Sequence, residues 1–196
     1  MVDKLKIIAS LRARLVEDRF FHSLNVAQMA KELAAIYGED EEKAYYAGLV
    51  HDCTKNTAPE KQLEIMEQSG LQLTDLEQNS PKLWHAMSGS IFMQSAYEIT
   101  DPAMVSAVRY HTTGKAAMSL LEKIIYIADF TSAERDYPGV EQMRHFAHTD
   151  LDKAVFEGAA FTVKKLQQSG LPVHPDTLAA KDYYQSSECG MRISEL

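Results

Sequence analysis

The sequence predicts an all-α fold, and three observations carry that prediction. Apolar residues recur at the three- and four-residue spacing of helices along almost the whole chain. Period-2 alternation of β-branched residues between turns, which marks strands, is essentially absent. Residues that begin and end helices stand at the edges of the apolar segments. We therefore expect helices joined by loops, without a sheet.

The periodic segments divide into separate helices along the chain. Their predicted ranges are 3–17, 22–37, 40–51, 59–69, 82–97, 101–110, 117–130, 140–147, 150–169 and 176–186. Asp101 precedes Pro102, which places a capping side chain before a proline at the first helical position. Gly38 and Gly170 follow their helices where a left-handed residue is favoured. Asp176 is the expected cap of the last helix.

Length and composition favour one domain with a substantial core. The chain has 196 residues and a formal net charge of −8, which argues against binding to nucleic-acid backbones. No apolar run is long enough to cross a bilayer, and the N-terminus lacks a signal-peptide core. Cys53 and Cys189 are the only cysteines, so we expect a reducing cytoplasm rather than a disulfide framework or zinc ribbon. We expect no nucleic-acid or membrane partner, and a homodimer stays open.

Polar side chains end the apolar faces of five predicted helices. Residues three, four and seven positions apart share one helix face. His51, His111 and Asp129 end such a face and His22 and His85 begin one, so each face extends backward or forward from its polar residue. The faces are Ala44, Ala47 and Gly48 for His51; Met104, Ala107 and Val108 for His111; Leu121 and Ile125 for Asp129; Val26, Met29 and Leu33 for His22; Gly89, Phe92 and Met93 for His85. Together with Asp52, these histidines and carboxylates are expected where the core meets a cavity.

A metal site is one interpretation of this pattern, and a set of structural histidines is the other. A single histidine at the end of an apolar face is usually a hydrogen-bonded core residue. A carboxylate there needs a cation, a metal or several donors, and side chains converging from facing helices build metal sites in bundles. Imidazoles with carboxylates suit iron, manganese, nickel or zinc, whereas a magnesium site would use oxygen ligands alone. The residues therefore predict a divalent transition-metal site of one or two ions.

The order of these residues resembles a known signature. His22, then His51-Asp52, then Asp129 resembles the H…HD…D pattern of the HD-domain phosphohydrolase superfamily, and Lys55 completes HDxxK. Longer stretches, from residue 22 to residue 177, are similar to those of the bacterial YqeK-type HD proteins: HSLNVAQMA, AGLVHDCTK, YHTTG, MSLLEKIIYIADF, ERDYPGVE and LPVHPDT. The resemblance implies a single HD-domain helical bundle over residues 1–196. Its phosphohydrolase core would lie at about 18–135, with the C-terminal helices packed on it.

The resemblance also implies an activity and roles for residues. The family is associated with symmetrical hydrolysis of diadenosine tetraphosphate to two ADP, with iron as the expected metal and manganese or another transition metal left open. The implied metal ligands are His22, His51, Asp52 and Asp129. Asp52 would also orient or deprotonate the attacking water. His85 and His111 would act in catalysis, either as ligands of a second metal or as donors to the phosphates and the leaving oxygen.

A polyphosphate substrate needs cations around it. The candidates near the predicted site are Arg19, Lys55, Arg109, Lys115 and Arg135. Arginine suits bidentate phosphate contacts, while lysine acts as a point charge. A solvated surface charge is the favoured alternative for Lys115 and an equal one for Arg19 and Arg109. The resemblance around Arg135 favours a phosphate role there.

Three further side chains complete the predicted surroundings. Thr112 offers a hydroxyl, although a TTG turn is also common helix punctuation. His174 stands between two prolines, where contact with a base or ribose and a plain surface position are equal alternatives. Trp84 is expected in the core or a cavity wall, whereas His145 and His148 are expected to be structural or solvated.

The leading functional hypothesis is therefore an enzyme that cleaves diadenosine polyphosphates symmetrically. One alternative keeps the metal chemistry and changes the nucleotide to a monophosphate or a guanosine alarmone. Another is a metal-bearing sensor that binds a nucleotide without turnover.

Overall fold

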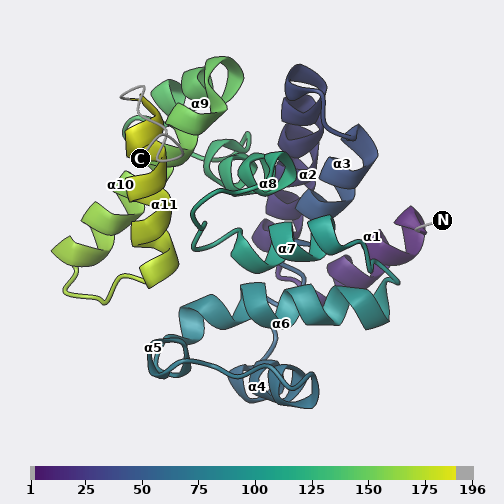
Figure 1. The fold of residues 1–196 in the computed structure, drawn as a ribbon. Coiled ribbons are helices and arrows are strands. Elements are labelled where there is room, and N and C mark those ends of the chain that lie inside the picture. The colour runs from purple at the N-terminus through teal and green to yellow at the C-terminus, as the bar shows by residue number, and fades with distance from the viewer. Residues whose placement is uncertain (1–2, 189–196) are drawn as a thin grey trace.

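The computed structural model describes residues 3–188, so Cys189 lies outside the described residues. Within that range no strand occurs, which confirms the all-α class (Figure 1). The helices are α1 (Lys4–Arg14), α2 (Glu17–Tyr37), α3 (Glu41–Val50), α4 (Pro59–Gln68), α5 (Asp75–Gln78), α6 (Pro81–Ala96), α7 (Pro102–Tyr110), α8 (Leu120–Thr131), α9 (Val140–Thr149), α10 (Leu151–Gln168) and α11 (Pro175–Glu188). Among these described helices, none combines the length and the apolar character that a membrane crossing requires.

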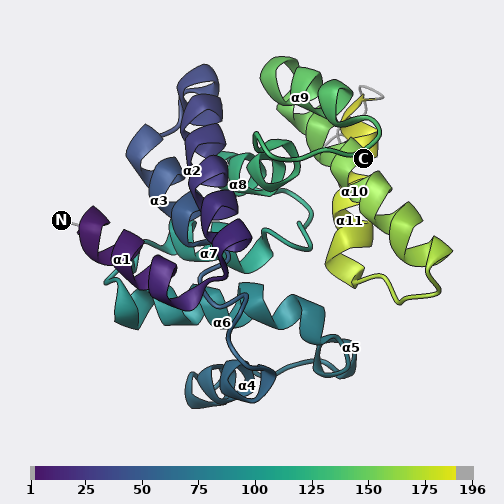
Figure 2. The same cartoon turned by 180° about the vertical axis from the view of Figure 1, so that it is seen from behind.

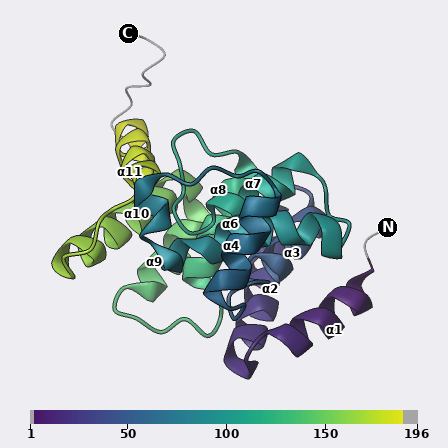
Figure 3. The same ribbon diagram turned by 90° about the horizontal axis from the view of Figure 1, so that it is seen from below.

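Helix α8 lies at the centre of the molecule. In Figures 1 and 2, α1 to α3 lie on one side of it and α9 to α11 on the other, with α4 to α6 below. Figure 3 shows α10 and α11 at the end of the molecule opposite α1. Residues 124–128 of α8 are fully buried, as expected of a helix that is apolar all round. The next residue, Asp129, is therefore carried into the middle of the fold.

Helices α2 and α3 approach each other through small residues. A Cβ atom added at Gly48 would lie 2.9 Å from Cα of Ala27, too close for any side chain. Ala27, Ala30, Ala44 and Ala47 are fully buried. This close contact brings the C-terminal end of α3 next to the N-terminal half of α2.

The predicted helix over 3–17 is wrong at its C-terminal end, because the chain breaks between α1 and α2. Leu15 and Val16 are extended, with ψ of 144° and 155°. The Leu15 side chain is buried, and the Val16 N–H donates to Oδ1 of Asn56 at 3.0 Å. Neither glycine nor proline marks this break, so the helical period continues through it. Consequently α2 begins earlier than predicted, and His22 lies inside it rather than at its start.

Two other differences concern short-range capping. The segment between the predicted helices 59–69 and 82–97 contains α5, which begins with a capping box formed by Thr74 and Glu77. Asp176 does not cap the last helix, because it lies within the first turn of α11. The Asp176 N–H instead donates to Nδ1 of His174 at 3.1 Å, so His174 is the capping residue.

Other predicted boundaries are confirmed. Asp101 accepts hydrogen bonds from the N–H groups of Ala103 and Met104 at the start of α7. Gly38 ends α2 in the left-handed conformation, with φ of 77°, and Gly170 has φ of 65° after α10.

The C-terminal helices pack on α8 and on the loop that precedes it. A Cβ atom at Gly158 of α10 would lie 3.3 Å from the ring of Tyr126 and 3.5 Å from that of Phe130. The Tyr184 hydroxyl on α11 accepts the N–H of Met118 at 2.9 Å. These contacts place His174, which joins α10 to α11, on the same side of the molecule as the predicted site.

Candidate metal centre

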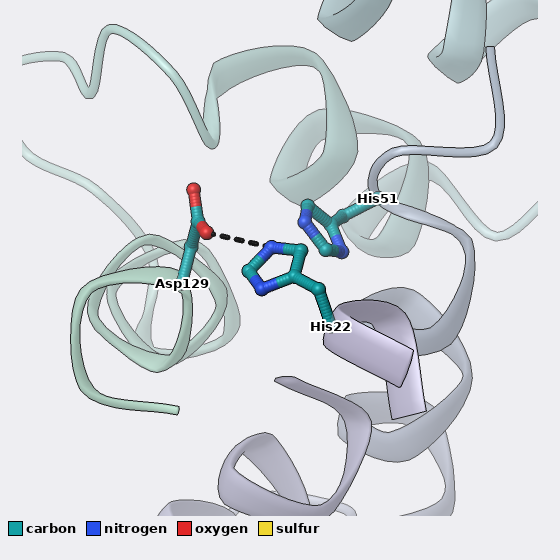
Figure 4. A group of neighbouring side chains, drawn as sticks. All are labelled: His22, His51 and Asp129. Atoms are coloured by element: carbon teal, nitrogen blue, oxygen red, sulfur yellow. Dashed lines mark ion pairs between the residues drawn. The ribbon is translucent and has the colours of Figure 1, made fainter. Parts of the chain in front are cut away.

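The six side chains predicted from the sequence converge in the structure. His22 lies on α2, His85 on α6 and Asp129 on α8, while His51-Asp52 and His111 directly follow α3 and α7. Four imidazoles form a chain, with ring centroids 5.1 Å apart for His22 and His51, 4.9 Å for His51 and His111, and 5.2 Å for His85 and His111. Two sets of three residues bring donor atoms within 4.8 Å of one another: His22, His51 and Asp129 (Figure 4), and His51, Asp52 and His111.

His51 and His111 each hydrogen-bond to the last turn of their own helix. Nδ1 of His51 lies 2.7 Å from the carbonyl oxygen of Gly48, and Nδ1 of His111 lies 2.7 Å from that of Val108. Because a carbonyl oxygen only accepts, each Nδ1 carries the ring proton. The same bonds satisfy carbonyl groups that a helix C-terminus leaves without a partner. Each Nε2 keeps its lone pair and lies 3.5 Å from a carboxylate oxygen of Asp52.

His22 stands between two carboxylates. Its Nδ1 hydrogen-bonds to Glu134, and its Nε2 lies 3.0 Å from Oδ1 of Asp129, the pair marked in Figure 4. A neutral imidazole carries a single N–H proton. When that proton is on Nδ1, the Nε2 and the Asp129 oxygen present lone pairs to each other. A cation between them turns this repulsion into attraction.

Unsatisfied buried atoms provide the test of whether these residues suit a metal. Within the described chain, Nε2 of His22, Nε2 of His51 and Oδ1 of Asp52 are buried without a hydrogen-bond partner. Leaving such an atom unpaired costs about 1–3 kcal/mol. Imidazole nitrogens and carboxylate oxygens are ligands of divalent transition metals, and metal-binding histidines have the other ring nitrogen held by a neighbour. The residues fit such an ion.

The protonation states also suit metal binding. Burial lowers the pKa of His51 to about 4 and that of His85 to about 3, so both rings are neutral at pH 7. Burial acts to raise the pKa of Asp52, but His51, His111, His85 and Lys55 together hold it well below its ordinary value. The pKa of Asp129 is also lowered, because His22, His51 and Arg135 outweigh its burial. His51 and His85 are therefore neutral and both aspartates ionised, the forms in which these groups bind metals.

Two arginines hold the two carboxylates. Arg19 Nη1 donates to Oδ2 of Asp52 at 2.8 Å. Arg135 pairs with the Asp129 carboxylate and also donates from Nε to its backbone oxygen at 2.7 Å. Both arginine side chains remain about one-third exposed, at 30% and 35%. Each can therefore orient a carboxylate and still present an open side to an anion.

Lys55, His85 and Thr112 connect the cluster to a cavity. Lys55 Nζ lies 3.0 Å from Nε2 of His85 and 3.8 Å from Oδ1 of Asp52. The Thr112 hydroxyl lies 3.3 Å from Nε2 of His85 and 3.2 Å from Nε2 of His111. Burial lowers the pKa of Lys55, although Asp52 opposes that shift.

The cavity has a volume of about 430 Å³ and reaches from the cluster to the α10–α11 connection. Lys55, His85 and Thr112 line one end of it, and His174 lies in its wall. Leucines and prolines make up half of the remaining lining residues. A cavity of this size is typical of sites for small organic ligands.

Other predicted residues lie elsewhere or have other partners. Arg109 donates to the buried carboxylate of Glu77 at 2.8 Å and lines a different cavity, between α6 and α7. Lys115 is paired with buried Glu122 at 2.8 Å rather than simply solvated. Trp84 is buried, as predicted, and donates to a backbone oxygen. The phosphate contact of Arg109 stays a prediction to which this position lends no support.

Glu134 is the prominent residue of the centre that sequence reasoning missed. It lies in the ERDYPGVE stretch, which drew attention for Arg135 alone. Its carboxylate accepts hydrogen bonds from His22, from Asn25 at 2.7 Å and from Ser132 at 2.8 Å. A loop glutamate has no periodic pattern to identify it, because only the fold brings residue 134 to residue 22.

This fold and site define a class of protein: an all-helical domain in which a helical histidine, a His-Asp pair and a later aspartate form one cluster of candidate metal ligands. The model of the HD domain family matches residues 19–134. The chain belongs to the HD-domain family.

Several relatives match this chain over nearly its whole length. A protein of Bacillus subtilis named bis(5'-nucleosyl)-tetraphosphatase, symmetrical, is 34% identical over 94% of this chain and 99% of its own length. A Staphylococcus aureus protein of the same name is 35% identical over 95% of this chain and 96% of its own length. The crystal structure of a predicted HD superfamily hydrolase involved in NAD metabolism, from Clostridium acetobutylicum, has a TM-score of 0.92 and 41% identity. The match covers 95% of this chain and 99% of that one.

Proposed function

We propose that this protein hydrolyses diadenosine tetraphosphate symmetrically, giving two molecules of ADP. One observation carries the proposal. Nitrogen and oxygen atoms of His22, His51 and Asp52 that can bind a metal are buried without a hydrogen-bond partner, and they lie beside a cavity that can hold a nucleoside. The similarity to symmetrical tetraphosphatases over more than nine-tenths of the chain supports the same substrate.

We propose His22, His51, Asp52 and Asp129 as ligands of a divalent transition-metal ion, with iron expected. A bound ion would neutralise phosphoryl charge and lower the pKa of a water molecule to about 7. His111 belongs to the second set of converging donors, with His51 and Asp52. It is the residue around which a second ion would bind, together with His85, which lies 3.2 Å from Asp52.

Each side chain around the proposed metal ion has a separate role in the proposed reaction. Asp52 is ionised, and its Oδ1 lacks a donor, so it can orient the attacking water and accept its proton. Lys55 stands at the junction of cluster and cavity, where its ammonium offsets phosphate charge. The Thr112 hydroxyl lies beside both His85 and His111 and can donate to a phosphate oxygen. Arg19 and Arg135 hold Asp52 and Asp129 in place.

The position of the cavity provides a reason for symmetrical cleavage. A nucleoside in the cavity would be held near His174, and its phosphates would pass Lys55 toward Asp52. The distance from the cavity to the cluster then determines how many phosphates stay with the bound nucleoside. We propose that this distance accommodates two phosphates, so that ADP forms on each side of the broken bond.

The cytoplasm is the proposed location. Buried Cys53 has its thiol pKa raised to about 12 by burial, which makes it an unreactive core residue that needs no oxidising compartment.

The test is metal analysis of protein purified without oxygen, paired with chromatography of the products on the same sample. Bound iron and ADP as the sole product from diadenosine tetraphosphate are expected. AMP plus ATP would contradict symmetrical cleavage. Tight nucleotide binding without any product would favour a sensor, and turnover only of a monophosphate or a guanosine alarmone would change the substrate.

A further inference from the structure

We infer that Glu134 is a positioning residue, which keeps the ring proton of His22 on Nδ1 and so leaves Nε2 free to bind the metal. The inference rests on the metal centre proposed above. It concerns a residue outside the predicted ligand set, on the loop between α8 and α9.

Three donors hold the Glu134 carboxylate in place. His22 Nδ1 and the Ser132 hydroxyl donate to Oε1, and the Asn25 amide donates to Oε2 at 2.7 Å. The loop itself is held by Arg144, which donates to the backbone oxygens of Ser132 at 3.0 Å and Arg135 at 2.9 Å. The carboxylate therefore has a defined position, although its side chain is 36% exposed.

His22 needs a stronger acceptor than His51 or His111. Backbone carbonyls suffice to hold the Nδ1 protons of His51 and His111, whose Nε2 atoms lie 3.5 Å from Asp52. The Nε2 of His22 is closer to a carboxylate oxygen, at 3.0 Å from Asp129. If the proton moved to Nε2, it would form a charge-assisted hydrogen bond to Asp129. That bond would occupy the nitrogen and the oxygen that are both required by the ion.

Glu134 therefore holds the His22 ring from the side opposite Asp129. Its charge-assisted bond to the Nδ1–H fixes the orientation of the ring, so that Nε2 faces the other proposed ligands. Without Glu134, nothing on the Nδ1 side would fix that orientation, and an incoming ion would have to restore it. Among the described residues, Glu134 contacts His22 and no other proposed metal ligand. Its loss is therefore expected to change metal affinity.

The test is titration of metal-free Glu134→Ala with Mn²⁺ and, without oxygen, with Fe²⁺. Losing an outer hydrogen-bond partner of a metal-binding histidine typically weakens metal affinity by roughly 10–100-fold, and we expect a change of that size. Glu32→Ala is the matched control, because Glu32 also pairs with a histidine ring, that of His148 at 2.8 Å, away from the centre. The thermal midpoint of each metal-free variant shows whether the fold is retained.

The conservative variant separates the charge of Glu134 from its hydrogen bonds. Glu134→Gln keeps a carbonyl oxygen for the Nδ1–H of His22, and rotation of the Asn25 amide lets its oxygen accept from the new amide group. Its metal affinity should therefore lie between those of wild type and Glu134→Ala. If Glu134→Ala does not fold, Asn25→Ala should still weaken affinity, because it releases one oxygen of Glu134.

The outcomes are distinct. Affinity of Glu134→Ala within twofold of wild type would overturn the inference, and a wild-type chain that binds neither ion would overturn it together with the metal centre. A wild-type chain that binds the ion but does not cleave diadenosine tetraphosphate would refute the proposed function and leave the role of Glu134 standing.

Discussion

Two buried carboxylates of this protein, Asp52 and Glu122, are equally hidden from solvent and differ in their partners. Their exposed fractions are 2% and 4%. Glu122 accepts hydrogen bonds from the hydroxyl of Ser106, the ammonium of Lys115 at 2.8 Å and the N–H of Ser119 at 2.7 Å. Oδ1 of Asp52 has no donor, although His85 and His111 lie 3.2 and 3.5 Å from it.

The two carboxylates show how a structural charge differs from a candidate metal ligand. Both carboxyl groups have lowered pKa values: burial opposes ionisation in each, and nearby groups overcome it. Charge and burial therefore do not separate them. What separates them is that both oxygens of Glu122 accept hydrogen bonds, whereas Arg19 holds only Oδ2 of Asp52 and imidazole nitrogens lie nearest to its Oδ1.

Replacing Asp52 is expected to have the largest effect on metal affinity and turnover. Asp52→Asn keeps the size of the side chain and removes the charge, so metal affinity and turnover should both collapse, with kcat at least roughly 10³-fold lower. The metal-free variant should keep its helical fold but unfold more easily, because the lowered pKa of Asp52 and its ion pair with Arg19 stabilise the folded state. Steady-state kinetics, metal content and thermal unfolding measure these quantities. A kcat within tenfold of wild type would refute the assignment.

Replacing Glu122 is expected to lower the free energy of unfolding and to leave the metal content unchanged. Glu122→Ala leaves Lys115 and the first turn of α8 without their partner, so unfolding in urea should become easier by roughly 2–3 kcal/mol. The lower figure applies if Lys115 moves into solvent. Metal content per folded molecule should not change. Loss of the metal from a correctly folded variant would show that Glu122 and Asp52 are not separate in function.

A smaller effect is expected where the cavity, rather than the cluster, contacts the substrate. His174→Asn removes the ring but keeps a residue type that caps helices well, so α11 should remain intact. The KM for diadenosine tetraphosphate should rise about tenfold, since a stacked base contributes about 1–3 kcal/mol, with kcat nearly unchanged. An unchanged KM would place the nucleoside elsewhere.

The smallest effect is a pH dependence of the metal-free protein. The pKa of His51 is lowered to about 4 in the folded state by burial, so between pH 6.5 and pH 4 the unfolded chain binds more protons and stability falls with acidification. One such histidine contributes roughly 1 kcal/mol between pH 6.5 and 5.5. His148 has the opposite sign, because a backbone oxygen and Glu32 raise its pKa, and its stabilisation is lost as pH rises. Urea midpoints at both pH values for wild type and His51→Ala test the slope, which should be shallower in the variant.

The features that the sequence predicted are those that depend on local spacing. His51, His111 and Asp129 could be placed at the ends of apolar helix faces, because a helical period is readable from neighbouring residues. The break at Leu15-Val16 could not be predicted, since it depends on burial of Leu15 and on the hydrogen bond that the Val16 N–H donates to distant Asn56.

The partners of charged side chains could not be predicted from the sequence either. Arg109 lies two residues before His111, but its guanidinium is bound to Glu77, 32 residues earlier in the chain. Glu134 reaches His22 across 112 residues. Both contacts are made by long side chains from separate helices and loops, and no spacing rule connects such positions. The short helix α5 is different, because its Thr74–Glu77 capping box was readable in the TDLE stretch.

The absence of a side chain at Gly48 has a consequence for ion choice. The separation of α2 and α3 is determined by backbone atoms in direct contact, which cannot adjust as packed side chains do. The span between the nitrogen donors of His22 and His51 is thus insensitive to changes in the surrounding core. A methyl group at position 48 would push the two helices apart and widen that span, which would favour ions of larger radius at the proposed metal centre.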